Sequence, residues 1–526
     1  MSRARGLALH PGGSVRVALG EGARGSDVFR RLALGAARCD LGDEGLYLAE
    51  ELLGGDDFLD ERQREALGHL ILAMLTASAQ GATRLPLDPR GPARALLAQV
   101  ASAAGTGASA DVMLKLIAGL VRDLDRGTFA SILGRPGQRR PLIVDDGHLY
   151  LERDHRRERD LAATLVPRLG VGAPDATVRA AVEAVRLRPA GPALDEDQLA
   201  AVAAALAGRV TVIVGGPGTG KTALAVALVR GLVRVGATRL ALAAPTGKAA
   251  NRLGEAIASA LAGLDEADAA DAPLVSTPPT AQTVHRLLGA GPRGFRHGAR
   301  APLPVDAVIV DEASMLDLRL AHALLAALPP DARLILLGDA DQLPSVEAGQ
   351  VLADLAAVGA DASWCRRLTR SFRMDPTDPD GRAVLEAARA VQAGDAGALL
   401  AGTTPRLRAI DPELPPTAPR GATLLDTDDD AVRDRVTAAA FARIATPTFV
   451  AWARADHRFD GERFDDAGQA ALAGMFAALD RGRVLTATRG LPTGAVAINA
   501  QLHELLLALT ARSRPTTRRS SCPGSR

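Results

Sequence analysis

Aromatic residues and lysines are both scarce in this sequence. Only 3% of its 526 residues are aromatic although 47% are hydrophobic, so its core must be built mainly from Ala, Leu and Val. Of its 62 basic residues, only Lys115, Lys221 and Lys248 are lysines. Arginine does not replace lysine where a compact ammonium must fit among phosphate oxygens. Lys221 and Lys248 lie in segments whose other residues also predict binding of phosphate groups.

Cysteines and long apolar runs are scarce too. Cys39, Cys365 and Cys522 lie far apart and form no CxxC pair, which argues against a disulfide framework and against a zinc site. No uncharged apolar run of about 18 residues is present, and the first residues lack the pattern of a signal peptide. We therefore expect a cytoplasmic protein that does not contact a membrane. The net charge of +1 excludes a globally basic protein but permits a local groove for nucleic acid.

The chain is long enough for about three domains of typical size. Residues 1–165 are predicted to form a mainly helical domain, because apolar residues recur at helical spacing in three stretches, 28–53, 60–79 and 110–123. Residues 166–190 are predicted to be a mostly helical linker.

One segment of the first domain has a different pattern. Residues 141–152, PLIVDDGHLYLE, predict a hairpin of two short alternating strands around Asp-Asp-Gly. We expect the nearby His148 and His155 to be surface residues rather than metal ligands.

A phosphate-binding loop lies in residues 210–228, where a β-branched run breaks into glycines and continues as an amphipathic helix. The segment matches G-x-x-x-x-G-K-[ST] in the strand and helix context that this pattern requires. Glycines allow backbone N–H groups to turn inward, Lys221 would reach the β and γ phosphates, and Thr222 would bind Mg²⁺. The predicted nucleotide-binding residues are Gly215, Gly216, Pro217, Gly218, Thr219, Gly220, Lys221 and Thr222.

Gln198 lies one helix upstream of this loop, where its amide could pair with the adenine edge. By itself this signal is weak, and a surface glutamine at the start of a helix is the alternative.

Carboxylates follow two buried strands downstream. Residues 305–310 form an apolar run that ends in Asp311 and Glu312, a placement suited to Asp311 holding Mg²⁺ and Glu312 polarising the attacking water. A second run, residues 334–338, ends in a turn that carries Asp339 and Gln342. We expect all four side chains to face one crevice.

A second group of residues suits nucleic-acid phosphates. Pro245, Thr246 and Lys248 follow a predicted strand, and their turn offers backbone amides, a hydroxyl and a positive charge. Thr283 and His285 lie near the start of a predicted short helix over 281–289, although His285 could also be an ordinary surface residue. Residues 259–280, between these two segments, are predicted to be a loop.

Four strands with intervening helices are predicted between residues 205 and 340, which favours an α/β fold with a parallel sheet and right-handed crossovers. From residue 366 onward the pattern is again α/β but looser. Residues 404–430 are a predicted loop, and residues 482–499 a predicted strand, turn and helix.

Six motifs occur in the order of a superfamily 1 DNA helicase, which they resemble: GGPGTGKT, APTGKAA, TVHRLLG, VIVDEAS, LLGDADQLPSVEAG and LTRSFR. Within that superfamily, DEAS with GDADQLPSV and the later RVLTATRGLPTGAVAINAQL most closely resemble the RecD family. GATRLPLD and PLIVDDGHLYLERD resemble stretches that precede the motor in that family. The resemblance extends from about residue 30 to residue 507. It implies a P-loop NTPase with a first RecA-like domain over 191–362 and a partial second one over 363–509. It also implies that residues 1–165 dock a partner subunit.

The resemblance also implies roles for individual residues. Gln198 would bind adenine, Asp311 and Glu312 the metal and the water, and Gln342 would sense the γ-phosphate. Arg373 would act on phosphate from the second domain, and Phe372 would stack near the base. The DNA contacts would be Pro245, Thr246, Lys248, Thr283 and His285.

By this resemblance the chain would be an ATP-dependent subunit of an exodeoxyribonuclease V of the RecBCD type. Its cofactors would be ATP and Mg²⁺, and its partners RecB-like and RecC-like subunits, single-stranded DNA and DNA ends. It would move 5′ to 3′ in double-strand break repair and recombination. A P-loop kinase has no support from these motifs.

The chain departs from the family near its end. The T-x-H-x-x-Q-G and T-R-A-R segments expected in the second motor domain are not found, and residues 510–526 have the arginine-rich composition of a disordered tail. We favour a truncated or frame-shifted end over a nucleic-acid-binding arm. The alternative function is then an ATP-binding scaffold subunit that does not translocate.

Overall fold

The computed structural model describes residues 43–54, 60–88, 96, 98, 110–123, 131–170, 172–264, 267–343, 345, 347–374, 377–400, 406–407, 422, 424–425, 429–486, 489 and 492–510. The chain divides into two compact units, Met1–Arg373 and Met374–Arg526. Cys39, Cys522, most of the predicted 404–430 loop and the predicted tail beyond Thr510 lie outside the described residues.

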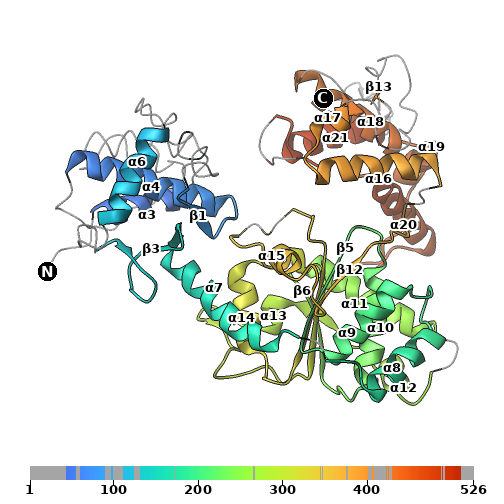
Figure 1. Cartoon of the computed structure of the whole chain (residues 1–526). Helices are drawn as coiled ribbons and strands as arrows, with labels where there is room; N and C mark the ends of the chain where they lie inside the picture. The colour runs from blue at the N-terminus through green and yellow to red at the C-terminus, as the bar shows by residue number, and fades with distance from the viewer. Residues whose placement is uncertain are drawn as a thin grey trace, which may run out of the picture. The chain divides into compact units, whose positions relative to one another are not determined.

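The first unit begins with helices packed on a small sheet (Figure 1). The three predicted helical stretches contain α3 (Asp43–Gly54), α4 (Glu61–Ala79) and α6 (Ala110–Arg122). Helix α4 begins with a capping box between Asp60 and Gln63 and is buried along most of its length. The sheet has the order β1-β4-β3-β2, and its strands are β1 (Arg84–Pro86), β2 (Leu133–Gly134), β3 (Leu142–Asp145) and β4 (His148–Leu151).

The predicted hairpin is confirmed, because β3 and β4 pair antiparallel. Its turn residues Asp146 and Gly147 both have positive φ, 44° and 71°, as a tight two-residue turn requires. The predicted surface position of His155 is wrong. Its ring is buried, lies edge-on to Tyr150 and has Nε2 2.9 Å from Asp145 Oδ2, because helix α7 (Glu152–Leu165) folds back toward the hairpin.

The main sheet of the first unit has six parallel strands in the order β12-β5-β11-β10-β6-β7. Its strands are β5 (Val210–Gly215), β6 (Leu240–Ala244), β7 (Ala281–Thr283), β10 (Ala307–Val310), β11 (Arg333–Gly338) and β12 (Cys365–Leu368). Four of these strands are the ones predicted from the sequence. The predicted α/β fold with a parallel sheet is therefore confirmed.

Helices cover both faces of this sheet (Figure 1). One face packs against α8 (Ala176–Leu187), α9 (Glu196–Ala207), α10 (Lys221–Arg234), α11 (Gly247–Ala262) and α12 (Ala272–Ser276). The other face packs against α7, α13 (Val284–Leu287), α14 (Leu318–Ala327) and α15 (Val351–Val358). Alternate strand residues enter the two cores, for example Ile213 on one face and Val212 on the other.

Four segments of this unit differ from the sequence prediction. Ala281–Thr283 is an edge strand paired with β6 before the short helix α13 begins, and the predicted 259–280 loop contains α12. Helix α8, in the predicted linker, packs its apolar face into the core with α9 and α10. Strand β12 lies beyond residue 363, where the second RecA-like domain was predicted to begin, yet it pairs with β5 of the first sheet. This pairing is a long-range contact, which a local sequence pattern does not encode.

The second unit is described mainly as helices: α16 (Pro379–Gln392), α17 (Ala396–Leu400), α18 (Asp429–Ile444), α19 (Pro447–Arg454), α20 (Asp466–Asp480) and α21 (Ala495–Thr510). Within its described residues the only paired strands are β13 (Arg406–Leu407) and β14 (Leu424–Leu425), apart from one isolated bridge. The predicted strand after residue 482 is wrong for 482–486. Leu485 in this segment is 90% exposed, so the apolar side chains of the predicted strand are not packed against a second surface.

No single helix in the described parts of the chain is long and apolar enough to cross a membrane. Two segments meet the length and composition criteria only as a pair, Val432–Ile444 and Pro447–Arg454, with a bend of 74° between them.

Candidate nucleotide and nucleic-acid site

The candidate site residues follow the carboxyl ends of the six parallel strands, which all meet at one edge of the sheet. The phosphate loop follows β5, Asp339 and Gln342 follow the neighbouring β11, and Asp311 and Glu312 follow β10. The candidate DNA residues follow β6 and β7 at the far end of the same edge. This is the edge at which open parallel sheets bind ligands.

The backbone of the phosphate loop requires glycine at two positions. Gly218 and Gly220 have φ of 80° and 77°, which residues with a Cβ rarely adopt. Gly220 is the N-cap of α10, so the loop leads directly into a helix N-terminus. The predicted strand, loop and helix are all present.

Lys221, the first residue of α10, extends back over the loop. Its Nζ donates hydrogen bonds to Gly215 O at 2.6 Å and to Gly216 O at 3.0 Å. Burial lowers the pKa of this ammonium, whereas the negative charges of Asp339, Glu312 and Asp311 oppose that effect. A partly buried ammonium that bonds carbonyl oxygens fits an anionic ligand such as phosphate. Thr222, the next residue, is exposed.

Gln198 is almost fully buried, with 3% of its surface exposed. Its Oε1 accepts from the backbone N–H of Asp195 at 3.0 Å and completes the capping box of α9. Its Nε2 donates to Thr219 O at 3.0 Å. The amide expected to bind adenine is thus bonded to the phosphate loop itself.

Residues 369–373, which directly follow β12, lie against the phosphate loop. The backbone N–H of Phe372 donates to Gly218 O at 2.8 Å, and Ser371 Oγ donates to Pro217 O at 3.2 Å. A Cβ on Gly218 would lie 2.4 Å from the Cβ of Arg373, so the two backbones are in close contact. The resemblance assigns Arg373 to the second motor domain, whereas the structure places it in the first unit beside the loop.

The ring of Phe372 is half exposed, and the Arg370 guanidinium lies 4.9 Å from its centroid. Such a ring offers a face on which a base could stack.

Asp311 and Glu312 follow β10 with different environments. Burial raises the pKa of the Asp311 carboxyl, and the charge of Lys221 opposes this effect. Glu312 has a left-handed backbone, φ 52° and ψ 39°, which is unusual for a residue with a side chain and is typical of strain held at functional sites.

The turn after β11 lies beside them. Asp339 is buried, and its Oδ1 accepts the backbone N–H of Asp341. Gln342 is exposed, and its Oε1 accepts a long hydrogen bond of 3.5 Å from Ser314 Oγ. Ser314 lies two residues after Glu312.

The candidate DNA residues sit at two helix starts. Thr246 caps α11 through a hydrogen bond from the N–H of Ala249, and Thr283 caps α13 through one from the N–H of Arg286. The register pairs Ala244 with Thr283, so both turns leave the sheet side by side. Pro245 is partly buried between β6 and this turn.

Two of the candidate DNA residues face solvent here. Lys248 and His285 are both exposed, and the His285 ring lies 5.9 Å from the Phe295 ring.

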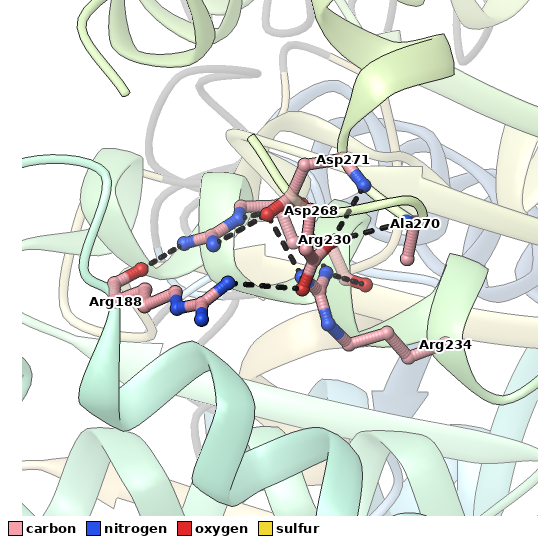
Figure 2. Close-up of polar contacts among 6 residues, drawn as sticks. All are labelled: Arg188, Arg230, Arg234, Asp268, Ala270 and Asp271. Atoms are coloured by element: carbon pink, nitrogen blue, oxygen red, sulfur yellow. Dashed lines mark hydrogen bonds and ion pairs between the residues drawn. The ribbon is translucent and has the colours of Figure 1, made fainter. Parts of the chain in front are cut away.

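A buried ion cluster behind the site is not apparent from the sequence (Figure 2). Arg230 on α10 and Asp271 before α12 are both fully buried and form a bidentate pair at 2.9 and 2.8 Å. Arg234 bonds Asp271 as well and also Asp268. Arg230 donates in addition to the carbonyl of Arg188. The acidic composition of residues 259–280 was the only available signal.

This cluster connects the helix that carries Lys221 to two distant segments. Burial alone would raise the pKa of Asp271, but hydrogen bonds from Arg230 and Arg234 outweigh it and hold this pKa well below its usual range. Asp271 therefore stays charged at neutral pH.

Comparison with known proteins places the site in context. A protein family described as "AAA domain" matches residues 198–348. The RecBCD enzyme subunit RecD of Mycobacterium tuberculosis is 43% identical over 295 residues, which cover 53% of this chain and 47% of that protein. The ATP-dependent RecD2 DNA helicase of Deinococcus radiodurans is 40% identical over 260 residues, 48% of this chain and 31% of that protein.

This chain thus spans at most about half the length of these relatives. A solved structure described as "Structural Basis for DNA Unwinding at Forked dsDNA by two coordinating Pif1 helicases" aligns with 38% of this chain and 49% of its own, at 21% identity and a TM-score of 0.25. The resemblance to RecD proteins that the motifs predict is confirmed by the sequence matches.

Proposed function

We propose that this chain, which resembles RecD proteins over about half of its length, is an ATP-dependent DNA helicase subunit that moves 5′ to 3′ on single-stranded DNA. One observation carries the proposal. The candidate nucleotide residues and the candidate DNA residues follow neighbouring strands at the same edge of one parallel sheet. The phosphate loop is then only a few strands away from the residues that would hold the DNA backbone, so a movement of the loop on nucleotide binding could be passed to them through the sheet.

The residues near the loop suit phosphoryl transfer. Lys221 would stabilise charge on the transferring phosphoryl group, and Glu312 would orient and polarise the attacking water. The hydroxyl of Thr222 and the carboxylate of Asp311 are oxygen donors that fit Mg²⁺, which keeps most of its remaining positions for phosphate and water. When bound there, Mg²⁺ would neutralise charge on the phosphates. Gln342 and Arg373 would respond to the γ-phosphate.

The relatives named RecBCD subunits support a place in a similar assembly. We propose RecB-like and RecC-like partners and DNA ends as the substrate, and hence a role in double-strand break repair in the cytoplasm. The scaffold alternative, in which the chain binds ATP without translocating, is decided by the same assay.

The test is ATP hydrolysis by the full chain with and without single-stranded DNA, followed by unwinding of duplexes with either a 5′ or a 3′ overhang. DNA-stimulated hydrolysis with unwinding of the 5′-overhang duplex is expected. ATP binding without stimulation or unwinding, both alone and with partner subunits, would favour the scaffold. Unwinding only from a 3′ overhang would reverse the proposed direction.

Glu312→Gln should bind ATP yet lose hydrolysis by about 10²- to 10⁴-fold, because the amide keeps the shape of the carboxylate but is no base. Steady-state hydrolysis and nucleotide binding are measured on the same preparation. The matched control is Glu255→Gln on the exposed face of α11, which should keep the parent rate. A Glu312→Gln rate near that of the parent would remove Glu312 from the catalytic residues.

Lys248→Ala should weaken binding to single-stranded DNA regardless of its sequence. It should also reduce the slope of log affinity against log salt concentration by about 0.7, because one phosphate contact releases about that many counterions from a single strand. Lys115→Ala, at an exposed position on α6, is the control. An unchanged slope for Lys248→Ala would show that this lysine does not contact phosphate.

A further inference from the structure

We propose that Ser371 is a positioning residue for the phosphate loop, and that it acts together with Gln198 from the outside of the loop. The inference rests on the proposed function, because it assumes that the loop binds the phosphates of a nucleotide. It adds a role for two side chains that would not themselves touch phosphate.

Three successive carbonyl groups of the loop are held by donors from other segments. Pro217 O accepts from Ser371 Oγ at 3.2 Å, and Gly218 O accepts from the backbone N–H of Phe372 at 2.8 Å. Thr219 O accepts from Gln198 Nε2 at 3.0 Å. Two protein segments far apart in the chain, one before and one after the loop, therefore supply all three donors.

These contacts set the direction of the loop amides. In a trans peptide the C=O and the next N–H point in opposite directions, and the described residues contain no cis peptide. A carbonyl held on the outside therefore turns the N–H of the following residue inward. The affected N–H groups belong to Gly218, Thr219 and Gly220, the row that would face the phosphates. Of these three groups, the N–H of Thr219 donates a long hydrogen bond of 3.4 Å to Gly216 O within the loop.

The outer donors are themselves fixed. Strand β12 pairs with β5 up to Leu368 and Gly215, so residue 371 begins from a position set by the sheet. The hydroxyl of Thr369 bonds Asp197 on α9 at 2.8 Å, one residue before Gln198. Gln198 is held by its own capping box. The glycine-rich loop, which would otherwise sample many conformations, is thus oriented from a rigid frame before a ligand binds.

Ser371→Ala removes one of the three donors and leaves the backbone unchanged. We expect about fivefold weaker binding of ADP that carries a fluorescent N-methylanthraniloyl group on its ribose, the usual effect of one lost hydrogen bond. Inorganic tripolyphosphate, which competes for the loop without a base or sugar, should lose affinity by a similar factor. Ser371→Thr keeps the hydroxyl and should restore both affinities. The thermal midpoint of the nucleotide-free protein should not change.

The matched control is Ser276→Ala. Ser276 Oγ makes the same kind of bond, to Pro273 O at 3.1 Å, at an exposed position of helix α12. It should leave both affinities at the parent value. If Ser371→Ala also binds with parent affinity, Ser371 does not position the loop, although nucleotide binding by the parent would still support the proposed function. If the parent chain binds neither probe, both proposals are overturned.

Gln198→Glu separates positioning from adenine recognition. Glutamate can still complete the capping box, but it has no N–H for Thr219 O. A positioning role predicts about tenfold weaker binding for the labelled ADP and for tripolyphosphate alike, because a carboxylate would face the Thr219 carbonyl. A loss confined to adenine nucleotides would assign Gln198 to the base and overturn its part in the proposal.

Discussion

Lys221→Ala is expected to reduce DNA-stimulated ATP hydrolysis by on the order of 10³-fold. In the structure this ammonium bonds two carbonyls of the phosphate loop, Gly215 O and Gly216 O. Alanine removes the one cation that the described loop and its helix place there. Charge that develops on the transferring phosphoryl group then loses its nearest fixed counter-charge.

The measurement is single-turnover hydrolysis at saturating ATP, so that weaker binding does not hide a slower chemical step. Lys115→Ala is the control for the loss of an exposed lysine, and circular dichroism checks that the fold is retained. Hydrolysis by Lys221→Ala at a rate near that of the parent would show that the loop is not the catalytic phosphate site.

Asp271→Asn is expected to destabilise the chain by about 3–5 kcal/mol, the usual cost of leaving a buried charge without its partner. The Arg230 guanidinium is fully buried, and Asp271 is its bidentate partner (Figure 2). An amide cannot neutralise it and can accept only part of its hydrogen bonds. The effect should be seen in urea unfolding followed by far-UV circular dichroism.

The control is Glu183→Gln, which removes one partner of the exposed pair with Arg186 and should leave the unfolding midpoint unchanged. The double variant Arg230→Met, Asp271→Leu should recover much of the loss, because it removes both charges and fills similar space. An unchanged midpoint for Asp271→Asn would show that the cluster contributes nothing to stability.

The same carboxylate predicts a dependence on pH. Because its pKa is depressed in the folded state, Asp271 contributes stability that is fully present above the pKa of an unfolded aspartate, about 3.9, and is lost as pH falls. The difference in stability between the parent and Asp271→Asn should therefore shrink on acidification below that range. A difference that stays constant down to pH 3 would contradict the depressed pKa.

Local residue patterns were sufficient to predict the phosphate loop, the strand before it and the carboxylates after β10. Each of these depends on neighbouring residues. Glycines at fixed spacing open the loop, Lys221 begins the next helix, and an apolar run ends in Asp311. The hairpin of β3 and β4 was predictable for the same reason, since two turn residues between alternating strands specify it.

Contacts between residues that lie far apart in the chain could be seen only in the folded structure. The sequence suggests that the Gln198 amide is available for adenine, but in the structure it is hydrogen-bonded to Asp195 at the N-cap of α9 and to Thr219. Strand β12 lies more than a hundred residues beyond β5, yet it brings Ser371 and Arg373 against the loop. The partner of Arg230 lies in a segment whose local composition predicts only a loop. Such pairings depend on which surfaces are buried together, and burial is a property of the packed chain rather than of any short stretch of residues.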